Sequence, residues 1–508
     1  METYSSLPAT LVGIAVAAAI FCARFAAPFE DEDHQQRYLW SGFAGILSWP
    51  ALVFLAASLP NDVLKDLLAP LYLGQVALLV YLFSRVTRGR IADFIKPSML
   101  GLIYIGISVG LGAFMYSIEA VVRSRDLADY MSWYHMAEVY SAVSGSFLIM
   151  FLISLWPPRA TFGPPPTESQ PKGYYTAGVL TVLLFASLPI DHPLMAVPWA
   201  VLACSTFFIV FRNKFKWRWL VVALIVGVMA AFAYDSKRNA IFLLLPALLL
   251  EARYGSARLN WRWVRIGVPM AFVVGFLIIT MSLIRMPNAQ RSFTEAAAEV
   301  PTYAADPKNL ALISNHFELG YMFFHTHNSV QASLQIDRLN AHGLTYLKAL
   351  FVPVPFGDKP PSYIDLYTRW AEYDFRERGG SWMASALGEP FWNFGIWGFA
   401  MLALVIGLLD WVYKHLLRNI GRNIAVSGLA LAMITFILQL LRGSGFDIYV
   451  AYSMVAAGVA IVVAMVAMTT GGMAISRKRY TYMPRSEVRV RTPPAPDSPG
   501  ARIRPAGA

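Results

Sequence analysis

Charged residues and cysteines are scarce in this sequence. Of the 508 residues, 14% are charged and 57% are hydrophobic, whereas about 25% of the residues in an ordinary soluble domain are charged. A water-soluble protein of this size could not cover so much apolar side chain with so few charges, so the composition excludes a cytosolic enzyme and a disordered chain. The two cysteines, Cys22 and Cys204, lie in apolar runs, which excludes a disulfide scaffold. The remaining class is an all-α integral membrane protein.

The motifs of several large enzyme classes are also missing. The sequence contains no P-loop, no dinucleotide fingerprint, no nucleophile elbow and no zinc-protease helix. His325 and His327 stand two residues apart, but no third ligand follows at a diagnostic spacing. We therefore expect neither a cofactor nor a metal site. The two histidines are interpreted either as proton carriers or as hydrogen-bonded structural residues.

Long apolar runs account for most of the chain. About 20 apolar residues in a helix cross a hydrocarbon core of about 30 Å, and shorter runs suffice where anchoring residues flank them. By this criterion the sequence predicts thirteen transmembrane helices, at 7–25, 39–59, 67–85, 98–117, 139–156, 174–190, 195–212, 219–235, 239–252, 264–284, 388–412, 424–441 and 448–470. The first run is expected to be retained, because Glu2 is its only early charge and a signal peptide begins with basic residues.

Lysine and arginine are unevenly divided among the predicted loops. The connections after the third, seventh, ninth and eleventh runs are basic, as is the C-terminal tail, whereas the alternate connections are sparse in these residues. Since cytoplasmic loops carry the excess of basic residues, the C-terminus is predicted inside and the N-terminus outside. From Ile475 onward eight basic and two acidic residues give a net charge of +6. Residues 471–508 are therefore expected to form a disordered tail beside anionic lipid, without a role in nucleic-acid binding.

One connection is far longer than the others. It runs from 285 to 387, between the predicted helices of 1–284 and those of 388–470, and the alternation of loops puts it outside. It holds four of the eight histidines and a proline-rich passage from Val352 to Pro361. Structureless loops of this length are uncommon unless they are functional. We expect a large external loop that forms a small, partly helical cap.

Three turns on the predicted outer side carry arginine, contrary to the general charge rule. Lys237 and Arg238 form the short turn between two runs, and Arg442 precedes a Gly-Ser-Gly turn between the last two. Arg378 precedes Gly379 and Gly380, which allow a tight turn or close approach to a ligand. A guanidinium suits a phosphate or pyrophosphate group, to which it can bind in a bidentate manner. Either the arginines converge on one multiply charged anion, or each is an ordinary helix-end anchor.

Glu389 follows about two turns into the next apolar helix, beside Pro390. An ionisable group in an apolar helix is costly unless it is paired or faces water. It is therefore a candidate for function, and the alternative is a carboxylate at the headgroup level that is paired with a nearby arginine.

The pattern around these residues resembles the late block of bacterial Wzy-type polymerases, which join O-antigen or exopolysaccharide repeat units. The matching elements are Gly379-Gly-Ser, Leu387-Gly-Glu, Asn393-Phe-Gly and Trp397-Gly before a long apolar helix. Ser236-Lys-Arg-Asn is similar to the Ser-Arg external turn of that family, although Lys237 replaces the commoner small residue.

The resemblance implies a glycosyltransferase of the bacterial inner membrane, with a periplasmic N-terminus and no metal or nucleotide. Its substrate would be an undecaprenyl-pyrophosphate-linked glycan, polymerised at the periplasmic face. Its partners would be membrane lipids, a flippase and a chain-length regulator. On this interpretation Lys237, Arg238, Arg378 and Arg442 hold the pyrophosphate at the Gly379–Gly380 turn.

The remaining roles follow from the same resemblance. Glu389 is the first candidate for the general base, with His325 or His327 second, and Trp382 stacks on a sugar ring with other aromatic residues of the loop. An O-antigen ligase, which uses the same donor and a lipid A–core acceptor, fits the sequence nearly as well. A transporter is the third alternative.

Overall fold

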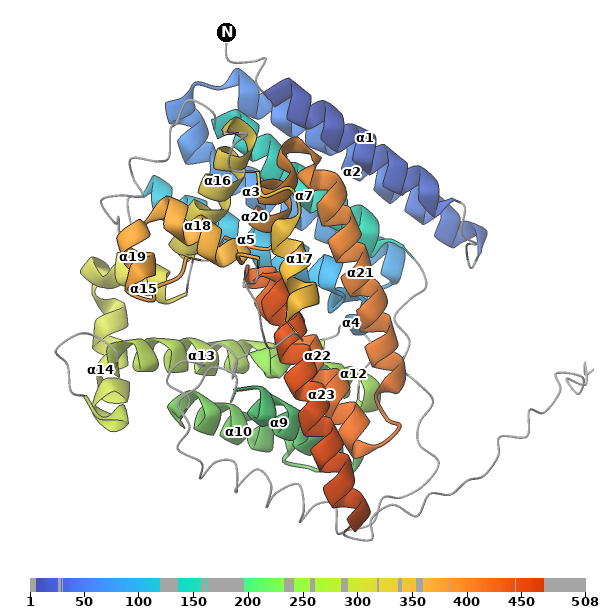
Figure 1. Cartoon of the computed structure of the whole chain (residues 1–508), viewed down its shortest axis with the longest axis vertical. Helices are drawn as coiled ribbons and strands as arrows, with labels where there is room; N and C mark the ends of the chain where they lie inside the picture. The colour runs from blue at the N-terminus through green and yellow to red at the C-terminus, as the bar shows by residue number, and fades with distance from the viewer. Residues whose placement is uncertain are drawn as a thin grey trace, which may run out of the picture.

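The computed structural model describes residues 6–25, 29, 31–118, 136–156, 162, 196–232, 242–255, 261–284, 291–317, 319–336, 340–352, 360–382, 384–443 and 445–469. All the regular elements of these residues are helices, arranged as a bundle with several short helices gathered on one side (Figure 1).

The helices of the first half of the chain are α1 (Ser6–Arg24), α2 (Glu32–Ser58), α3 (Asn61–Thr87), α4 (Ile91–Phe94), α5 (Pro97–Ser117), α7 (Met136–Ser154), α9 (Ala196–Arg212), α10 (Arg218–Phe232), α12 (Leu244–Tyr254) and α13 (Trp261–Ile284). Those of the second half are α14 (Phe293–Ala305), η4 (Pro307–Asn309), α15 (Leu310–His316), α16 (Leu319–Gln335), α17 (Leu344–Phe351), α18 (Tyr363–Ala371), α19 (Tyr373–Glu377), α20 (Gly388–Phe394), η6 (Gly395–Trp397), α21 (Gly398–Asn419), α22 (Ile424–Arg442) and α23 (Phe446–Thr469).

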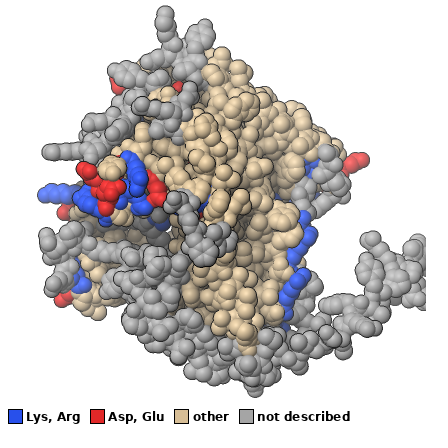
Figure 2. Space-filling view, viewed as in Figure 1, with Lys and Arg blue, Asp and Glu red and all other residues tan. Residues whose placement is uncertain are grey.

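Eight spans among the described residues are long and apolar enough to cross a membrane: they lie in α1, α2, α3, α5, α7, α13, the combined stretch from α20 to α21, and α22. Three shorter apolar helices lie in α9, α10 and α23. Large apolar side chains are exposed on these helices, among them Trp40 at 76% and Phe54 at 77%, and uncharged surface covers much of the face in Figure 2. This is the architecture of an all-α membrane protein, as the composition predicts.

The helix count of thirteen stays a prediction. The run predicted at 174–190 and the turn at 236–238 lie outside the described residues. Several helices also begin earlier than the apolar runs suggest. α2 begins at Glu32, because the Asp31 side chain caps it by accepting a hydrogen bond from the His34 amide. A capped first turn of polar residues therefore makes the helix longer than the apolar run from which it was predicted.

α7 is the central helix of the bundle, and it contacts α1, α2, α3, α5, α16 and α21. Polar groups join it to its neighbours: the Trp49 indole donates to Ser144 Oγ at 2.9 Å, and the Gln75 amide donates to the Ser144 carbonyl at 2.9 Å. Thr10 and Ser141 share a hydrogen bond of 2.8 Å. Apolar packing alone discriminates poorly between helices in lipid, and such bonds fix how they are rotated.

α16 belongs to the predicted external loop but packs deep within the protein. Its residues Met322, Phe323 and Phe324 are buried in the main hydrophobic core, and the helix contacts α5, α7 and α20. Gly112 on α5 allows this approach, because a Cβ there would overlap the Leu319 carbonyl oxygen. This part of the predicted loop therefore packs against the long apolar helices. The cap at 285–387 stays a prediction.

The predicted helix at 388–412 is interrupted. α20 ends at Phe394, and the chain passes through η6 before α21 begins at Gly398. Gly395 adopts φ 52°, in the left-handed region that favours glycine. The interruption separates the short helix that carries Glu389 from the long apolar helix after it.

We predict that Gly112→Ala destabilises the protein by roughly 1–3 kcal/mol, because the added methyl group overpacks the contact between α5 and α16. Gly74→Ala is the matched control, since a Cβ on Gly74 would meet no atom within 4 Å. Thermal unfolding of the purified protein in detergent compares the two. Equal unfolding temperatures would show that the α5–α16 contact does not constrain the fold.

Candidate functional site

Two of the predicted segments come together at one end of the bundle. The Ala386 amide donates to the Leu441 carbonyl at 3.0 Å. Gly443, with φ 106°, packs so closely on Ala384 that a Cβ would overlap the Ala384 carbonyl. The turn after Arg442 is thus held against the chain that links α19 to α20. The half-buried Arg442 is the last residue of α22, directly before this turn.

Glu389 lies at the centre of this junction and is 4% exposed. Its Oε1 accepts a hydrogen bond from Thr345 Oγ1 at 2.8 Å, and its Oε2 accepts one from the Phe446 amide at 3.2 Å. The Asn393 amide donates to Thr345 Oγ1 at 2.7 Å and to the Glu389 carbonyl at 2.8 Å. The carboxylate therefore joins α17, α20 and the N-terminus of α23, where a negative charge is favoured.

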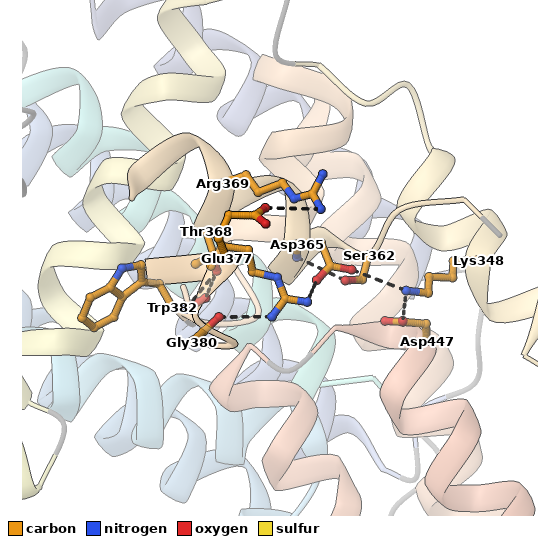
Figure 3. Close-up of polar contacts among 10 residues, drawn as sticks. Lys348, Ser362, Asp365, Thr368, Arg369, Glu377, Gly380, Trp382 and Asp447 are labelled. Atoms are coloured by element: carbon orange, nitrogen blue, oxygen red, sulfur yellow. Dashed lines mark hydrogen bonds and ion pairs between the residues drawn. The ribbon is translucent and has the colours of Figure 1, made fainter. Parts of the chain in front are cut away.

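A cluster of charged residues lies beside the junction (Figure 3). Lys348 on α17 lies between two carboxylates, with its Nζ 3.8 Å from Asp365 and 3.4 Å from Asp447. Arg376 pairs with the same Asp365 and donates to the Gly380 carbonyl at 3.1 Å. Five segments are joined here: α17, α18, α19, the chain directly after α19, and α23.

The environment of Asp365 sets its protonation. Partial burial opposes the charged form, but the hydrogen bonds from Ser362 and the charges of Arg376 and Lys348 outweigh it and lower the pKa of Asp365 below the ordinary 3.8. The carboxylate is therefore ionised throughout the neutral range. It has the role of holding two cations in place.

Arg378 is exposed and lies at the end of α19, where its Nε donates to the Asp374 carbonyl at 3.2 Å. Gly379 adopts φ 83°, as the predicted tight turn requires. Gly380 lies against the Phe375 ring and leaves no room for a Cβ. Figure 2 shows charged side chains gathered over α18 and α19. Among the described residues Arg378 forms no ion pair, so its guanidinium can meet an anion.

Trp382 is buried in an aromatic cluster below this turn. Its ring stacks on His325 with centroids 4.7 Å apart, and on Phe375 at 4.4 Å. Its indole N–H donates to Glu372 at 3.0 Å, and its backbone amide donates to Thr368 Oγ1 at 2.9 Å. The tryptophan is 8% exposed, so its faces are already covered by protein.

His327 has a defined tautomer. Its Nδ1 lies 2.8 Å from the Phe323 carbonyl, which can only accept, so Nδ1 carries the proton. Its Nε2 then accepts from the Tyr72 hydroxyl at 2.9 Å. His325 Nδ1 lies 2.8 Å from the Tyr367 hydroxyl. Burial lowers the pKa of His325 to about 3 and that of His327 to about 4, so both rings are neutral at pH 7.

The remaining predicted residues are Lys237 and Arg238, which lie outside the described residues. Conversely, Lys348, Asp365 and Arg376 form a cluster in the structure that no sequence motif predicts. No local spacing marks them, because Lys348 and Arg376 reach Asp365 from 17 and 11 residues away in the chain. The nearest signal is that Arg376 belongs to the same Arg-Glu-Arg-Gly-Gly segment as Arg378.

Within the described parts of the chain, no group of three or more His, Cys, Asp and Glu side chains is arranged to hold a metal ion. The chain matches no protein-family model, no curated protein and no solved structure.

We predict that Asp365→Asn lowers the unfolding temperature at pH 7, because Lys348 and Arg376 lose their shared partner. The native pKa is lowered, so the charged form stabilises the fold above the ordinary value of 3.8, and this contribution is lost as the pH falls through the native pKa. The difference between the two proteins should therefore stay constant from pH 7 down to about pH 4, and shrink only as the pH falls below 3.8 toward the lowered native pKa. Asp374→Asn, at an exposed carboxylate on α19, controls for the lost charge. A difference that does not shrink below pH 3.8 would contradict the assigned role.

Proposed function

We propose that this protein is a membrane glycosyltransferase that polymerises undecaprenyl-pyrophosphate-linked oligosaccharide repeat units into O-antigen or exopolysaccharide. The reaction would take place at the periplasmic face of the bacterial inner membrane. The observation that carries the proposal is the contact between the turn after Arg442 and the chain from Ala384 to Glu389, six residues beyond Arg378. The chain that follows Arg378 and the turn that follows Arg442 thereby meet beside Glu389.

The chemistry needs few protein groups. A hydroxyl oxygen of the acceptor glycan bonds to the anomeric carbon of the donor, and the bond from that carbon to the pyrophosphate oxygen breaks. The electron pair leaves with the polyprenyl pyrophosphate, and the hydroxyl proton passes to a base. Arg378 and Arg442 would neutralise the charge that builds on the leaving group, together with Lys237 and Arg238 of the similar external turn.

Glu389 remains the first candidate for the base. A carboxylate has about four lone-pair positions, and the bonds from Thr345 and Phe446 occupy two of them. His327 is less suited, because both ring nitrogens are engaged and its lowered pKa makes it a weak proton acceptor. His325 is limited in the same way by burial.

The orientation belongs to the same proposal. With thirteen spans the N-terminus is periplasmic and the C-terminus cytoplasmic, so the long connection at 285–387 faces the periplasm. Charged residues on α18 and α19 lie at the opposite side of the molecule from the basic end of α21 in Figure 2, which supports this assignment.

Two alternative functions, a ligase and a transporter, are compared with the polymerase. A ligase uses the same donor, and the contacts described here fit it equally well. A transporter would carry polar groups at mid-membrane, where Gln75 and Gln439 are candidates, but Gln75 is engaged in helix packing with Ser144. Deletion of the gene separates the enzymes: lipid A–core carrying one repeat unit indicates a polymerase, and undecorated lipid A–core indicates a ligase.

We predict that Arg378→Ala abolishes polymer while single repeat units still appear on lipid, because the leaving pyrophosphate loses a cation. The residue is exposed, so the protein should fold and reach the membrane normally. Arg369→Ala is the matched control. It removes an arginine from the same charged surface, one that lies 3.9 Å from Glu377, and should leave the polymer unchanged. Gel electrophoresis of surface polysaccharide gives the result, and normal chain length in Arg378→Ala would remove this residue from the site.

Glu389→Gln tests the base separately. The amide keeps the shape of the side chain but cannot take up a proton, so we expect polymer to fall by about 100-fold or more at a normal membrane level of the protein. Thr345→Val keeps the carboxylate but removes one hydrogen bond to it, and should retain measurable polymer. If Glu389→Gln makes full-length polymer, Glu389 has only the structural role of joining α17, α20 and α23.

A further inference from the structure

The polar side chains of α16 are paired with residues far away in the sequence. His325 contacts Tyr367, Thr326 donates to Ser385 at 3.0 Å, and His327 contacts Tyr72. The next pair continues this pattern: Ser329 and the Tyr363 hydroxyl lie 2.7 Å apart. Each of these polar groups therefore has a protein partner that offsets the cost of its burial.

Asn328 lies between His327 and Ser329 on α16, but its side chain is not paired as theirs are. Its side chain is 2% exposed, yet neither Nδ2 nor Oδ1 has a hydrogen-bond partner in the described protein. A carboxamide offers two donors and an acceptor with two lone pairs. Burial of such a group without a partner opposes folding. The amide is thus kept at a cost in stability, which is typical of groups that serve a bound molecule.

Aromatic side chains lie about one turn before Asn328 on α16. Phe324, one turn earlier on α16, packs against Tyr116 with ring centroids 5.1 Å apart, and Lys65 Nζ lies 5.0 Å from the centre of the Tyr116 ring. His325, three residues before Asn328, stacks on Trp382. Aromatic residues, a cation and an amide therefore occur together on and around this helix. Amide groups pair with neighbouring sugar hydroxyls, which both donate and accept.

We propose that Asn328 binds hydroxyl groups of a sugar in the lipid-linked repeat unit and contributes to the choice of that sugar. The proposal rests on the proposed function, because it assumes that a glycan reaches α16. A side-chain amide does not take up a proton near neutral pH, so Asn328 is a binding residue and not a further base. Hydrogen bonds to a substrate hydroxyl discriminate strongly, because a glycan without that hydroxyl leaves the buried amide unpaired.

Asn328→Leu tests this role, since leucine replaces the amide with an apolar group of similar size. The variant should unfold at the same or a higher temperature than the native protein, while polymer falls about tenfold or more. Thr326→Val is the control on the same helix. It removes a satisfied hydrogen bond to Ser385 and should lower the unfolding temperature. A purely structural amide predicts that Asn328→Leu behaves like Thr326→Val, with lowered stability, and that result overturns the proposal.

A binding measurement separates the sugar from the pyrophosphate. The purified full-length protein in nanodiscs is heated with undecaprenyl pyrophosphate, or with lipid-linked glycan extracted from the deletion strain. Both probes should raise the unfolding temperature of the native protein, the glycan by more. Asn328→Leu should keep the response to undecaprenyl pyrophosphate and lose the additional response to glycan. An unchanged additional response overturns the role of Asn328.

The two proposals fail in distinguishable ways. If deletion of the gene leaves the polysaccharide unaltered, the proposed function fails and the sugar contact fails with it. If deletion abolishes polymer, and the Asn328→Leu variant expressed in the deletion strain makes the native amount of polymer, the proposed function stands. In that case only the assignment of Asn328 is wrong.

Discussion

The hydrogen bond from the Phe446 amide to the Glu389 carboxylate is the interaction on which the arrangement of this end of the bundle depends. A carboxylate that is 4% exposed needs partners for its charge, and it finds them on two other elements. Thr345 brings α17, and Phe446 brings the start of α23. Because Lys348 lies on the same short helix as Thr345, α17 also connects the buried carboxylate to the charged cluster at Asp365 and Asp447.

This arrangement gives the site two zones of different character. The inner zone holds Glu389, the paired histidines and Trp382, all of which are buried and engaged by other groups. The outer zone holds Arg378, which is exposed. A lipid-linked pyrophosphate would meet the outer cation at the level of the lipid headgroups, while the attached glycan extends toward the inner groups. This division belongs to the proposed function, in which charge leaves toward the membrane surface and a proton is taken up inside.

Much of the architecture follows from the sequence, because long apolar runs have few alternatives to membrane-crossing helices. The runs at 98–117 and 424–441 correspond closely to α5 and α22. The sequence also marks the Gly379 turn, since a glycine pair is one of the few local signals of positive φ. The depth of α16 could not be predicted in the same way. Its His, Thr, Asn and Ser residues are typical of a solvated loop, and their partners on α3, α18 and the chain before α20 are invisible to local spacing. For the same reason, spacing could not show that Arg376, and not Arg378, pairs with Asp365.

The interruption at Gly395 has a mechanical consequence. Long apolar helices tilt to match the thickness of the surrounding bilayer, and the cost is only fractions of a kcal/mol per Å of mismatch. α21 is such a helix, whereas Glu389 lies on the far side of the break, on α20, which is held by α16 and α17. The break at Gly395 lets α21 run in a different direction from α20, while the two helices stay in contact through Phe391 and Phe399. The short helix that carries Glu389 therefore need not share the tilt of the long helix that follows it.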